Sequence, residues 1–194
     1  FIIFNKNVLL IDINQSALSD ILANHMSFTD KGAAPVLERA LIANKIAVSA
    51  DLAMASKARF IFICINTPID EHIASNTNII PGIISELIAI VTLTSEHRII
   101  VRSTVCPGTL RHINRDILPA NLLRAVYCPE RAIQGRALLD LLTFPQIVGK
   151  ELDDAGLDIY DLFNSISVKC ITVSTIEAEL VKLFSNSWRY IEFA

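Results

Sequence analysis

Residues 98–109 read Arg98-Ile99-Ile100-Val101-Arg102-Ser103-Thr104-Val105-Cys106-Pro107-Gly108-Thr109. The stretch opens with a short apolar run rich in Ile and Val, as in a strand that is buried on both faces. Small hydroxyl residues and a Pro-Gly pair then predict a turn, and helical spacing follows at residues 108–117. A buried strand, a turn and a covering helix form the repeating unit of α/β proteins.

The same alternation runs along most of the chain. Short apolar segments flanked by turn residues predict strands at 8–13, 58–65, 98–101, 124–127, 146–148 and 168–173. Segments with helical spacing lie between them, at 16–24, 34–44, 81–92, 108–117 and 152–166. Residues 1–174 are therefore expected to form one α/β domain with a doubly wound, Rossmann-like parallel sheet.

After Ser174 the pattern changes to a single long amphipathic helix at residues 175–193. Ser174 or Thr175 is the expected N-cap, and Glu177 and Glu179 lie near the positive end of the helix dipole. We expect this helix to leave the sheet domain and to begin a second domain over residues 175–194. Its apolar residues cover a wide arc, which is typical of a helix buried on more than one side: Ile176, Leu180, Leu183, Phe184, Trp188, Ile191 and Phe193.

Composition excludes several classes of partner. With 194 residues, 52% of them hydrophobic, and a mean hydropathy of +0.47, the chain can bury a sizeable core. A net charge of −3 and the lack of any Lys/Arg-rich run argue against nucleic acid as a partner. The apolar runs are too short or too interrupted to span a bilayer, so we expect a soluble protein without a membrane partner.

The four cysteines, Cys64, Cys106, Cys128 and Cys170, are widely spaced and lie mostly inside strand-like apolar runs. This arrangement predicts reduced, buried thiols rather than a disulfide framework or a metal site. A cytosolic, cytoplasmic location is the corresponding expectation.

Lys182 and Asn186 lie four residues apart on the long helix, so they share one helix face. An ammonium and an amide side by side could together hold an oxygen atom on which negative charge develops. The alternative is that both side chains are solvated, as charges on helices usually are.

Polar residues follow several predicted strands, at the edge where ligands of open α/β sheets bind. Asp12 ends the first strand and could accept hydrogen bonds from ribose hydroxyls, although the segment also resembles an ordinary N-cap region. The segments 64–68 and 102–109 could meet a dinucleotide through hydroxyls and backbone N–H groups, or could be plain turns. Glu130 presents a carboxylate at the same edge.

Taken in order, six blocks resemble the signature of the nucleotide-sugar dehydrogenases, the UDP-glucose/GDP-mannose dehydrogenase family. They are residues 8–14, 64–68, 103–109, 128–137, 145–149 and 178–186. The form Tyr127-Cys128-Pro129-Glu130-Arg131, followed by Gly135-Arg136-Ala137, resembles the branch that oxidises UDP-N-acetylhexosamines, especially UDP-N-acetylmannosamine. The UDP-glucose branch usually has an aromatic residue after the Glu.

The resemblance implies an NAD-dependent, two-step oxidation of the C6 alcohol of a UDP-sugar to the uronic acid, for surface polysaccharide synthesis. UDP-N-acetylmannosamine is the favoured substrate and UDP-glucose the next. The aldehyde would be held on a cysteine, oxidised to a thioester and hydrolysed. The resemblance also implies a homodimer formed through the helix from Thr175, in the central domain.

Residue roles follow from the same resemblance. Lys182 and Asn186 would steady the C6 oxyanion, and Glu130 would position or deprotonate the hydrolytic water. Thr104 would lie beside the nicotinamide. The expected cofactor contacts are Asp12, Ile65, Asn66, Thr67, Pro68, Ser103 and Thr104, and the expected substrate contacts are Glu130, Arg131, Lys182 and Asn186. No metal ligand is expected.

Departures from the family pattern leave other readings open. Leu10 stands where Gly is common, Ala17 where a basic residue often approaches the adenosine, and Arg102 where an acid or Lys is usual. By the same resemblance, the family's own first strand and its Gly-rich loop would precede Phe1, and the catalytic cysteine would follow Ala194. The chain alone is therefore expected to be inactive. The alternatives are a non-catalytic nucleotide-binding paralogue and another NAD(P)-dependent, hydroxyacid-type dehydrogenase, although the latter leaves the Cys-Pro-Glu-Arg block unexplained.

Overall fold

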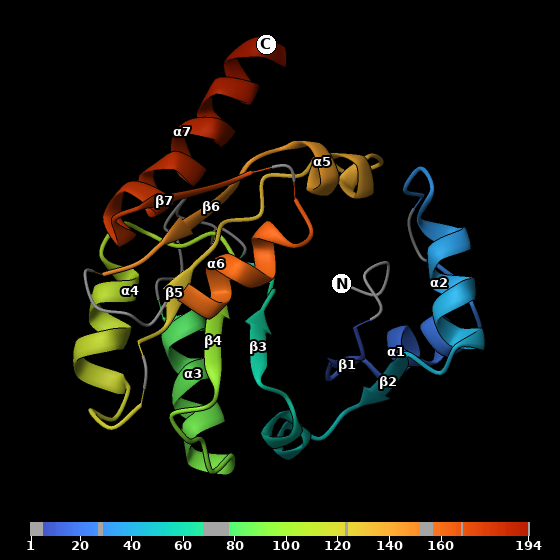
Figure 1. Ribbon diagram of the computed structural model, residues 1–194, viewed down its shortest axis with the longest axis horizontal. Coiled ribbons are helices and arrows are strands. Elements are labelled where there is room, and N and C mark those ends of the chain that lie inside the picture. The colour runs from blue at the N-terminus through green and yellow to red at the C-terminus, as the bar shows by residue number, and fades with distance from the viewer. Residues whose placement is uncertain are drawn as a thin grey trace.

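A computed structural model describes residues 6–26, 29–67, 78–122, 124–151, 157–167 and 169–193. Within these ranges strands and helices alternate along the chain (Figure 1). The elements are β1 (Val8–Ile11), α1 (Gln15–Leu22), α2 (Ala33–Ile42), β2 (Ile46–Ser49), the 3₁₀ helix η2 (Leu52–Lys57), β3 (Phe60–Ile63), α3 (Ile79–Ile90), β4 (Arg98–Val101), α4 (Thr109–His112), the π-helical turn η3 (Ile113–Ile117), β5 (Val126–Tyr127), α5 (Ala137–Thr143), β6 (Gln146–Gly149), α6 (Leu157–Asn164), β7 (Cys170–Val173) and α7 (Thr175–Phe193).

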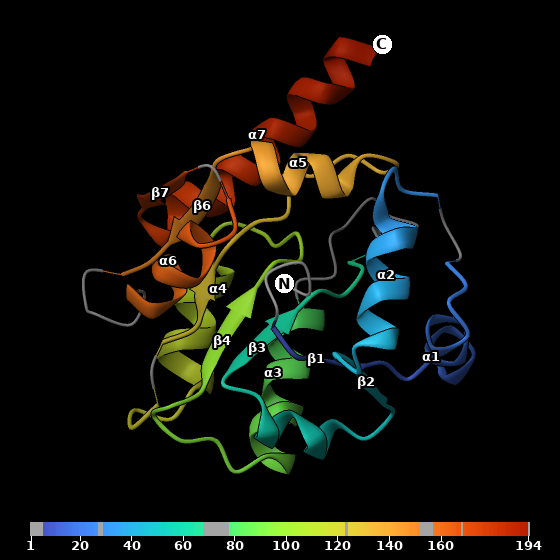
Figure 2. The same ribbon diagram turned by 45° about the vertical axis from the view of Figure 1, so that its right-hand side comes forward.

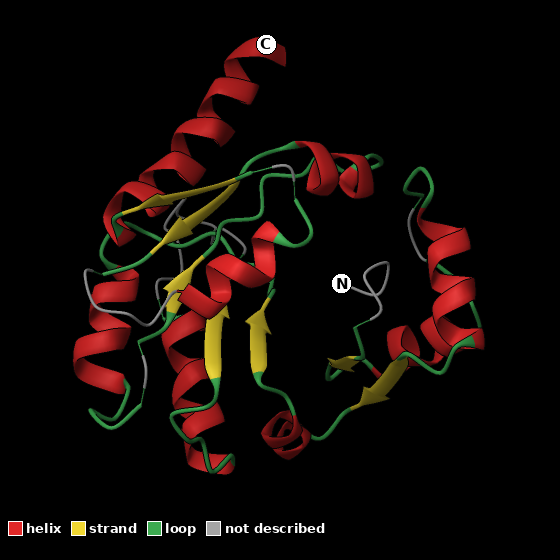
Figure 3. Cartoon of the chain, in the orientation of Figure 1, coloured by secondary structure: helices red, strands yellow, loops and turns green. Residues whose placement is uncertain are grey.

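The described strands form two sheets (Figure 3). One has five strands in the order β3-β4-β5-β6-β7, and the other pairs β1 with β2 in parallel, with Val8 opposite Ile46. All neighbours in the larger sheet are parallel except β5 and β6, which are antiparallel, with Tyr127 opposite Gly149. The α/β class and the mostly parallel sheet are confirmed, whereas the antiparallel pair and the division into two sheets were not predicted.

The larger sheet is covered on both faces, as in a doubly wound fold. Side chains alternate along β4, so that Ile99 and Val101 face one core while Ile100 faces the other. The first core includes the buried side of α3 and the start of α4, through residues such as Ile84, Leu87 and Leu110. The second core lies against α6, where the Phe163 ring packs edge-on against Phe62, with 6.1 Å between the ring centroids.

Asparagines end the two helices that accompany the smaller sheet. Asn24 (φ 58°) and Asn44 (φ 53°) adopt the left-handed conformation that Asn tolerates better than other residues with a Cβ. After α2, the N–H of Asn44 donates to Leu41 and the N–H of Lys45 donates to Ala40, at 3.0 and 2.9 Å. The corresponding pair of bonds follows α1, so both helices end in a Schellman motif.

Three elements were not predicted from the sequence. β2 is only four residues long and follows the left-handed Asn44 directly, so its Ile46-Ala47-Val48-Ser49 run reads as part of a loop. η2 and the seven-residue α5 are too short for a clear helical period. The predicted segment 152–156 lies outside the described residues, and α6 is described from Leu157.

α7 matches the predicted range of residues 175–193. Ser174 is its N-cap in a capping box, because the Ser174 N–H and hydroxyl donate to Glu177 at 2.8 and 2.7 Å. Gly149 of β6 lets the first turns approach the sheet closely, since a Cβ there would lie 2.4 Å from the Cβ of Ala178. The C-terminal half of α7 projects beyond the sheet in two views (Figures 1 and 2).

The prediction of buried cysteines holds for two of the four. Cys128 and Cys170 are buried and all four thiols are free, but Cys64 is exposed and Cys106 is half-buried. The apolar run around Cys64 ends as a strand at Ile63, which leaves this residue on the loop beyond the sheet edge. Within the described ranges, no helix has the length and apolar character needed to cross a bilayer.

Candidate functional site

The ends of β3, β4 and β5 bring the first group of predicted residues together. Ser103 is the second residue after β4, and its hydroxyl accepts a hydrogen bond from the Ile65 N–H at 2.7 Å. The Thr67 hydroxyl donates to the Thr104 carbonyl at 3.0 Å, and the Tyr127 hydroxyl donates to the Ser103 carbonyl at 3.1 Å. The loops after β3 and β4 are therefore cross-linked at the carboxyl edge of the sheet, where α/β proteins bind ligands.

Glu130 lies beyond the end of β5, next to Arg102, which directly follows the adjacent strand β4. One carboxylate oxygen accepts from the N–H groups of Arg131 and Ala132, both at 2.8 Å, and the other forms a short ion pair with Arg102. Burial raises the pKa of Glu130, but Arg102 and the two N–H donors outweigh that rise and hold the pKa below its ordinary value. Glu130 is thus a fixed, ionised acceptor at neutral pH.

Arg102 is a buried cation held from three sides. Its side chain is 7% exposed. Besides Glu130, its guanidinium lies 3.4 Å from the Gln146 amide oxygen of β6 and 5.2 Å from the centroid of the Phe163 ring. A planar guanidinium suits this combination of hydrogen bonds and ring stacking, so Lys would not be an equivalent replacement.

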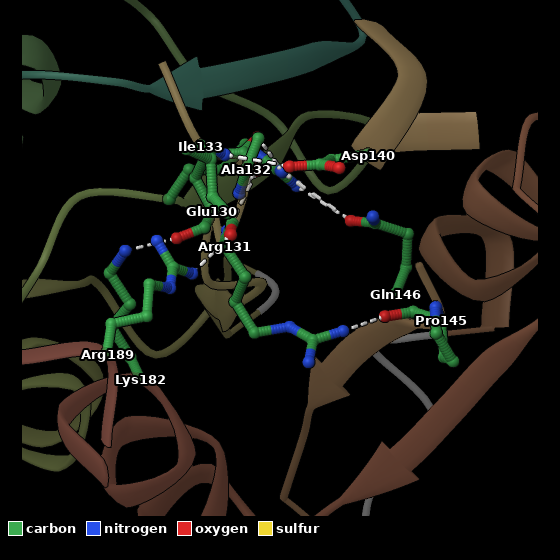
Figure 4. Close-up of polar contacts among 10 residues, drawn as sticks. Glu130, Arg131, Ala132, Ile133, Asp140, Pro145, Gln146, Lys182 and Arg189 are labelled. Atoms are coloured by element: carbon green, nitrogen blue, oxygen red, sulfur yellow. Dashed lines mark hydrogen bonds and ion pairs between the residues drawn. The ribbon is translucent and has the colours of Figure 1, made fainter. Parts of the chain in front are cut away.

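α7 reaches the loop after β5 with two cations (Figure 4). The Lys182 ammonium donates a short hydrogen bond to the Glu130 carbonyl, and Arg189 donates to the Arg131 carbonyl at 2.5 Å. Partial burial, together with the neighbouring Arg189, lowers the pKa of Lys182. Because an ammonium has three donors, Lys182 can bind a further oxygen while it keeps this contact.

The Arg131 side chain turns away from α7 (Figure 4). Its guanidinium donates a short hydrogen bond to the Pro145 carbonyl and lies 5.9 Å from the centroid of the Phe144 ring. Partial burial lowers the pKa of Arg131. The sequence predicted a substrate contact here, and in the structure this side chain packs against the segment that leads into β6.

Two predicted residues lie apart from this cluster. Asn186 shares the face of Lys182 on α7, but its side chain is exposed and forms no hydrogen bond among the described residues. Asp12 directly follows β1 and is exposed, and its carboxylate accepts from the Asn14 N–H at 2.8 Å. Pro68 lies outside the described residues.

Remote carboxylates fix both loops of the cluster. Asp30, which is 8% exposed, accepts from the N–H groups of Ala137 and Leu138 at 2.6 and 3.2 Å and so caps α5. Glu179 accepts from the N–H groups of Gly108 and Leu110 at 2.6 and 2.9 Å, at the start of α4. Burial raises the pKa of Glu179, and the two N–H donors oppose that rise.

From the sequence, Arg102 was only part of a segment that could meet a dinucleotide and Glu179 was only a charge near the helix dipole. Gln146, Arg189 and Asp30 had no predicted role. For Arg102 a signal existed, because a charged residue directly follows a buried apolar strand, next to the strand that leads to Glu130. Arg189 also follows Lys182 by seven residues, which is two turns along the same face. Asp30 and Glu179 bond to groups 107 and 71 residues away, and no local pattern carries that information.

A pocket of about 290 Å³ lies elsewhere, between the end of α3 and residues 119–122. No titratable side chain lines it, so it offers no group for acid–base or ionic chemistry. The cluster at the sheet edge is the better candidate site.

Comparison with known proteins shows the family of the chain. The model of the UDP-glucose/GDP-mannose dehydrogenase family, NAD binding domain, matches residues 1–167. The chain belongs to this family. The resemblance seen in the sequence blocks is confirmed, and the match argues against a hydroxyacid-type dehydrogenase outside the family.

Several relatives cover nearly the whole chain. The UDP-N-acetyl-D-mannosamine dehydrogenase of Methanococcus maripaludis is 25% identical over 189 residues, 95% of this chain and 43% of the relative. The UDP-glucose 6-dehydrogenase of Campylobacter jejuni is 29% identical over 199 residues, 96% of this chain and 48% of the relative. A crystal structure of GDP-mannose dehydrogenase from Pseudomonas aeruginosa has a TM-score of 0.87 at 19% identity, covering 99% of this chain and 46% of that one. The chain spans less than half the length of these relatives.

NAD is the cofactor of this nucleotide-sugar dehydrogenase domain. The described strand ends fit such a ligand. Ile65, on the loop after β3, is 39% exposed and offers an apolar surface for a flat ring, and Asn66 beside it is exposed too. The Asp12 carboxylate has one oxygen without a described partner, available for a ribose hydroxyl.

Proposed function

We propose that the protein oxidises the C6 alcohol of a UDP-sugar to the uronic acid with NAD, and that UDP-N-acetylmannosamine is the substrate, with UDP-glucose the next candidate. The observation that carries the proposal is the contact between Lys182 of α7 and Glu130, on the loop after β5 at the sheet edge. Relatives that bear the name UDP-N-acetyl-D-mannosamine dehydrogenase support the choice of sugar, as does Arg131 directly after Glu130.

In this proposal the Lys182 ammonium and the Asn186 amide stabilise negative charge that develops on the C6 oxygen. An ammonium that is partly desolvated interacts more strongly with an oxyanion than one in bulk water. The chemistry that NAD would supply, when bound, is that of a hydride acceptor for the two oxidations. Asp12, Ser103 and the residues from Ile65 to Pro68 would hold the dinucleotide, and Thr104 would lie beside its nicotinamide.

Glu130 would orient the water that releases the carboxylate product. Arg102 and two backbone N–H groups keep its carboxylate ionised and fixed, so it offers a stationary acceptor for one water hydrogen. The backbone carbonyl of Glu130 accepts a hydrogen bond from Lys182, so the proposed water acceptor and the proposed oxyanion donor are neighbours.

The wide apolar arc of α7 supports a homodimer through this helix. Phe184, Trp188 and Ile191 are 67%, 66% and 70% exposed and recur at the spacing of one helix face. A contiguous row of large apolar side chains is typical of a protein interface. The family resemblance adds surface polysaccharide synthesis as the setting of the reaction.

A second candidate is a non-catalytic nucleotide-binding protein. The observation that favours it is the ion pair between Arg102 and one carboxylate oxygen of Glu130. In the family resemblance, position 102 usually holds an acid or Lys. The two candidates differ in turnover, not in NAD binding.

The test is an assay of the full-length protein with UDP-N-acetylmannosamine, UDP-glucose and GDP-mannose, each with NAD⁺ or NADP⁺. We expect two NADH per sugar, the highest kcat/KM with UDP-N-acetylmannosamine, and little activity with NADP⁺, because Asp12 repels a 2′-phosphate. Asp12→Ala should narrow the preference for NAD⁺, whereas Asp161→Ala on the surface of α6 should not. NAD binding without turnover on any of the sugars would favour the binding protein.

A further inference from the structure

Glu179 is a charged residue in an unusual place. Its side chain is fully buried, with an exposed fraction of 0%, and it forms no ion pair among the described residues. Burying a carboxylate is costly unless hydrogen bonds compensate for the lost water. Here the compensation comes from two backbone N–H groups, those of Gly108 and Leu110, at 2.6 and 2.9 Å.

These two bonds fasten the far end of the loop that carries Thr104. Gly108 has a φ of +92°, and the loop turns there into α4. The near end of the loop is fastened to the sheet by the Ser103 hydroxyl, which donates to the Ile63 carbonyl of β3 at 3.3 Å. It is also fastened to the loop after β3, because Ser103 bonds to Ile65 and the Thr104 carbonyl bonds to Thr67. The sheet therefore fixes one end of the loop, and α7 fixes the other.

Lys182 follows Glu179 by three residues, so both side chains project from one side of α7. Glu179 contacts the loop after β4, and Lys182 contacts the loop after β5 through the Glu130 carbonyl. Ala178, directly before Glu179, rests against Gly149 of β6. A single turn of helix thus bonds to both loops of the candidate site.

We propose that Glu179 is a positioning residue, which sets the distance between Thr104 and Lys182 by bonding α7 to the loop after β4. The inference rests on the proposed function, since it assumes that Thr104 and Lys182 act on one substrate. Catalysis is sensitive to such spacing, because a displacement of about 1 Å can cost about 100-fold in rate.

The test compares Glu179→Gln and Glu179→Asp in the full-length protein. Gln has the size of Glu but lacks its charge and replaces one acceptor by a donor, whereas Asp keeps the charge on a shorter stem. Glu192→Gln is the matched control, because Glu192 lies on the same helix, α7, and is exposed. Both variants of Glu179 should lower kcat by about 10- to 100-fold with little change in KM for the sugar nucleotide. The control should stay within about twofold of the unmodified protein.

Two further readouts separate positioning from simple helix capping. In Glu179→Gln, amide hydrogen exchange should become faster at residues 105–110 and stay unchanged in α3. This result would show that the bonds from Gly108 and Leu110 to Glu179 hold the loop in place. On a Lys182→Ala background, Glu179→Gln should reduce kcat little further, because the distance it sets no longer matters. If the kcat losses of Lys182→Ala and Glu179→Gln multiply in the double variant, Glu179 only caps α4 and the proposal is overturned. A Glu179→Gln variant with normal kcat and lower thermal stability would lead to the same conclusion.

Failure of both variants to fold would assign Glu179 to folding and would also overturn it. The proposed function fails separately, if Lys182→Ala alone keeps normal turnover. Loss of turnover in Lys182→Ala together with normal turnover in both Glu179 variants would leave the proposed function standing and reject the positioning role.

Discussion

Lys182 is the side chain with the largest expected effect on turnover. Replacing it by Ala should lower kcat by about 10²–10³-fold and change KM for the UDP-sugar little, because its charge is needed where negative charge develops in the transition state. Steady-state kinetics of the full-length protein measure both constants. Lys57→Ala, an exposed lysine of η2, is the control and should leave kcat unchanged. Near-normal turnover in Lys182→Ala would mean that this ammonium only fastens α7 to the Glu130 carbonyl.

Glu130 should make stability depend on pH in a defined direction. Its pKa in the folded protein lies below the ordinary value of 4.5, so the ionised form contributes stability above that value. This contribution is lost as pH falls through the lowered pKa. The urea midpoint of Glu130→Gln should therefore lie below that of the unmodified protein at pH 7, and the gap should shrink at acid pH. Glu96→Gln, at an exposed position, should show no gap at either pH.

At the scale of single residues, the sequence reveals side chains that belong to a motif and does not reveal those whose partners lie far away in the chain. Glu130 and Lys182 belong to motifs with fixed spacing, and the structure joins them through a backbone carbonyl. Arg102 departs from the family pattern, and only the strand register shows that it faces Glu130. Charged residues on an amphipathic helix are usually solvated, yet the Glu179 side chain is fully buried.

At the scale of elements, Asp30 should stabilise α5 from a distance. Asp30→Ala removes the acceptor for two N–H groups at the start of the helix and should lower the free energy of unfolding by about 0.5–2 kcal/mol. Urea unfolding measures the loss, and hydrogen exchange at Ala137 and Leu138 should locate it. Asp161→Ala, on the exposed side of α6, is the control. Equal effects of the two substitutions would show that the cap contributes nothing measurable.

The elements themselves were predictable where the sequence supplies a long period or a clear boundary. α7 has 19 residues, and its capping box fixes the start, so its bounds match the expectation. α5 has seven residues, and its cap is Asp30, far away in the sequence, so neither period nor local cap marks it. The antiparallel direction of β6 depends on how the chain turns around α5, and an apolar run reads the same in both directions.

At the scale of the whole molecule, the exposed apolar face of α7 predicts self-association. Phe184, Trp188 and Ile191 would remain in contact with water in a single copy, and burying such a row yields about 25 cal/mol for each Å² of apolar area removed from water. Light scattering of the full-length protein at micromolar concentration should therefore give the mass of a dimer.

Trp188→Glu places a charge at the centre of this face and should shift the protein toward monomer, because a charge buried in an apolar interface without a partner is strongly unfavourable. Glu192→Gln, an exposed position one residue beyond Ile191, is the matched control and should leave the mass unchanged. Both substitutions leave α7 helical, so a change of mass in Trp188→Glu alone would show that the apolar face, and not the helix in general, makes the dimer contact. A monomeric mass for the unmodified protein would contradict the interface. A dimer that persists in Trp188→Glu would place the contact on another surface of the molecule.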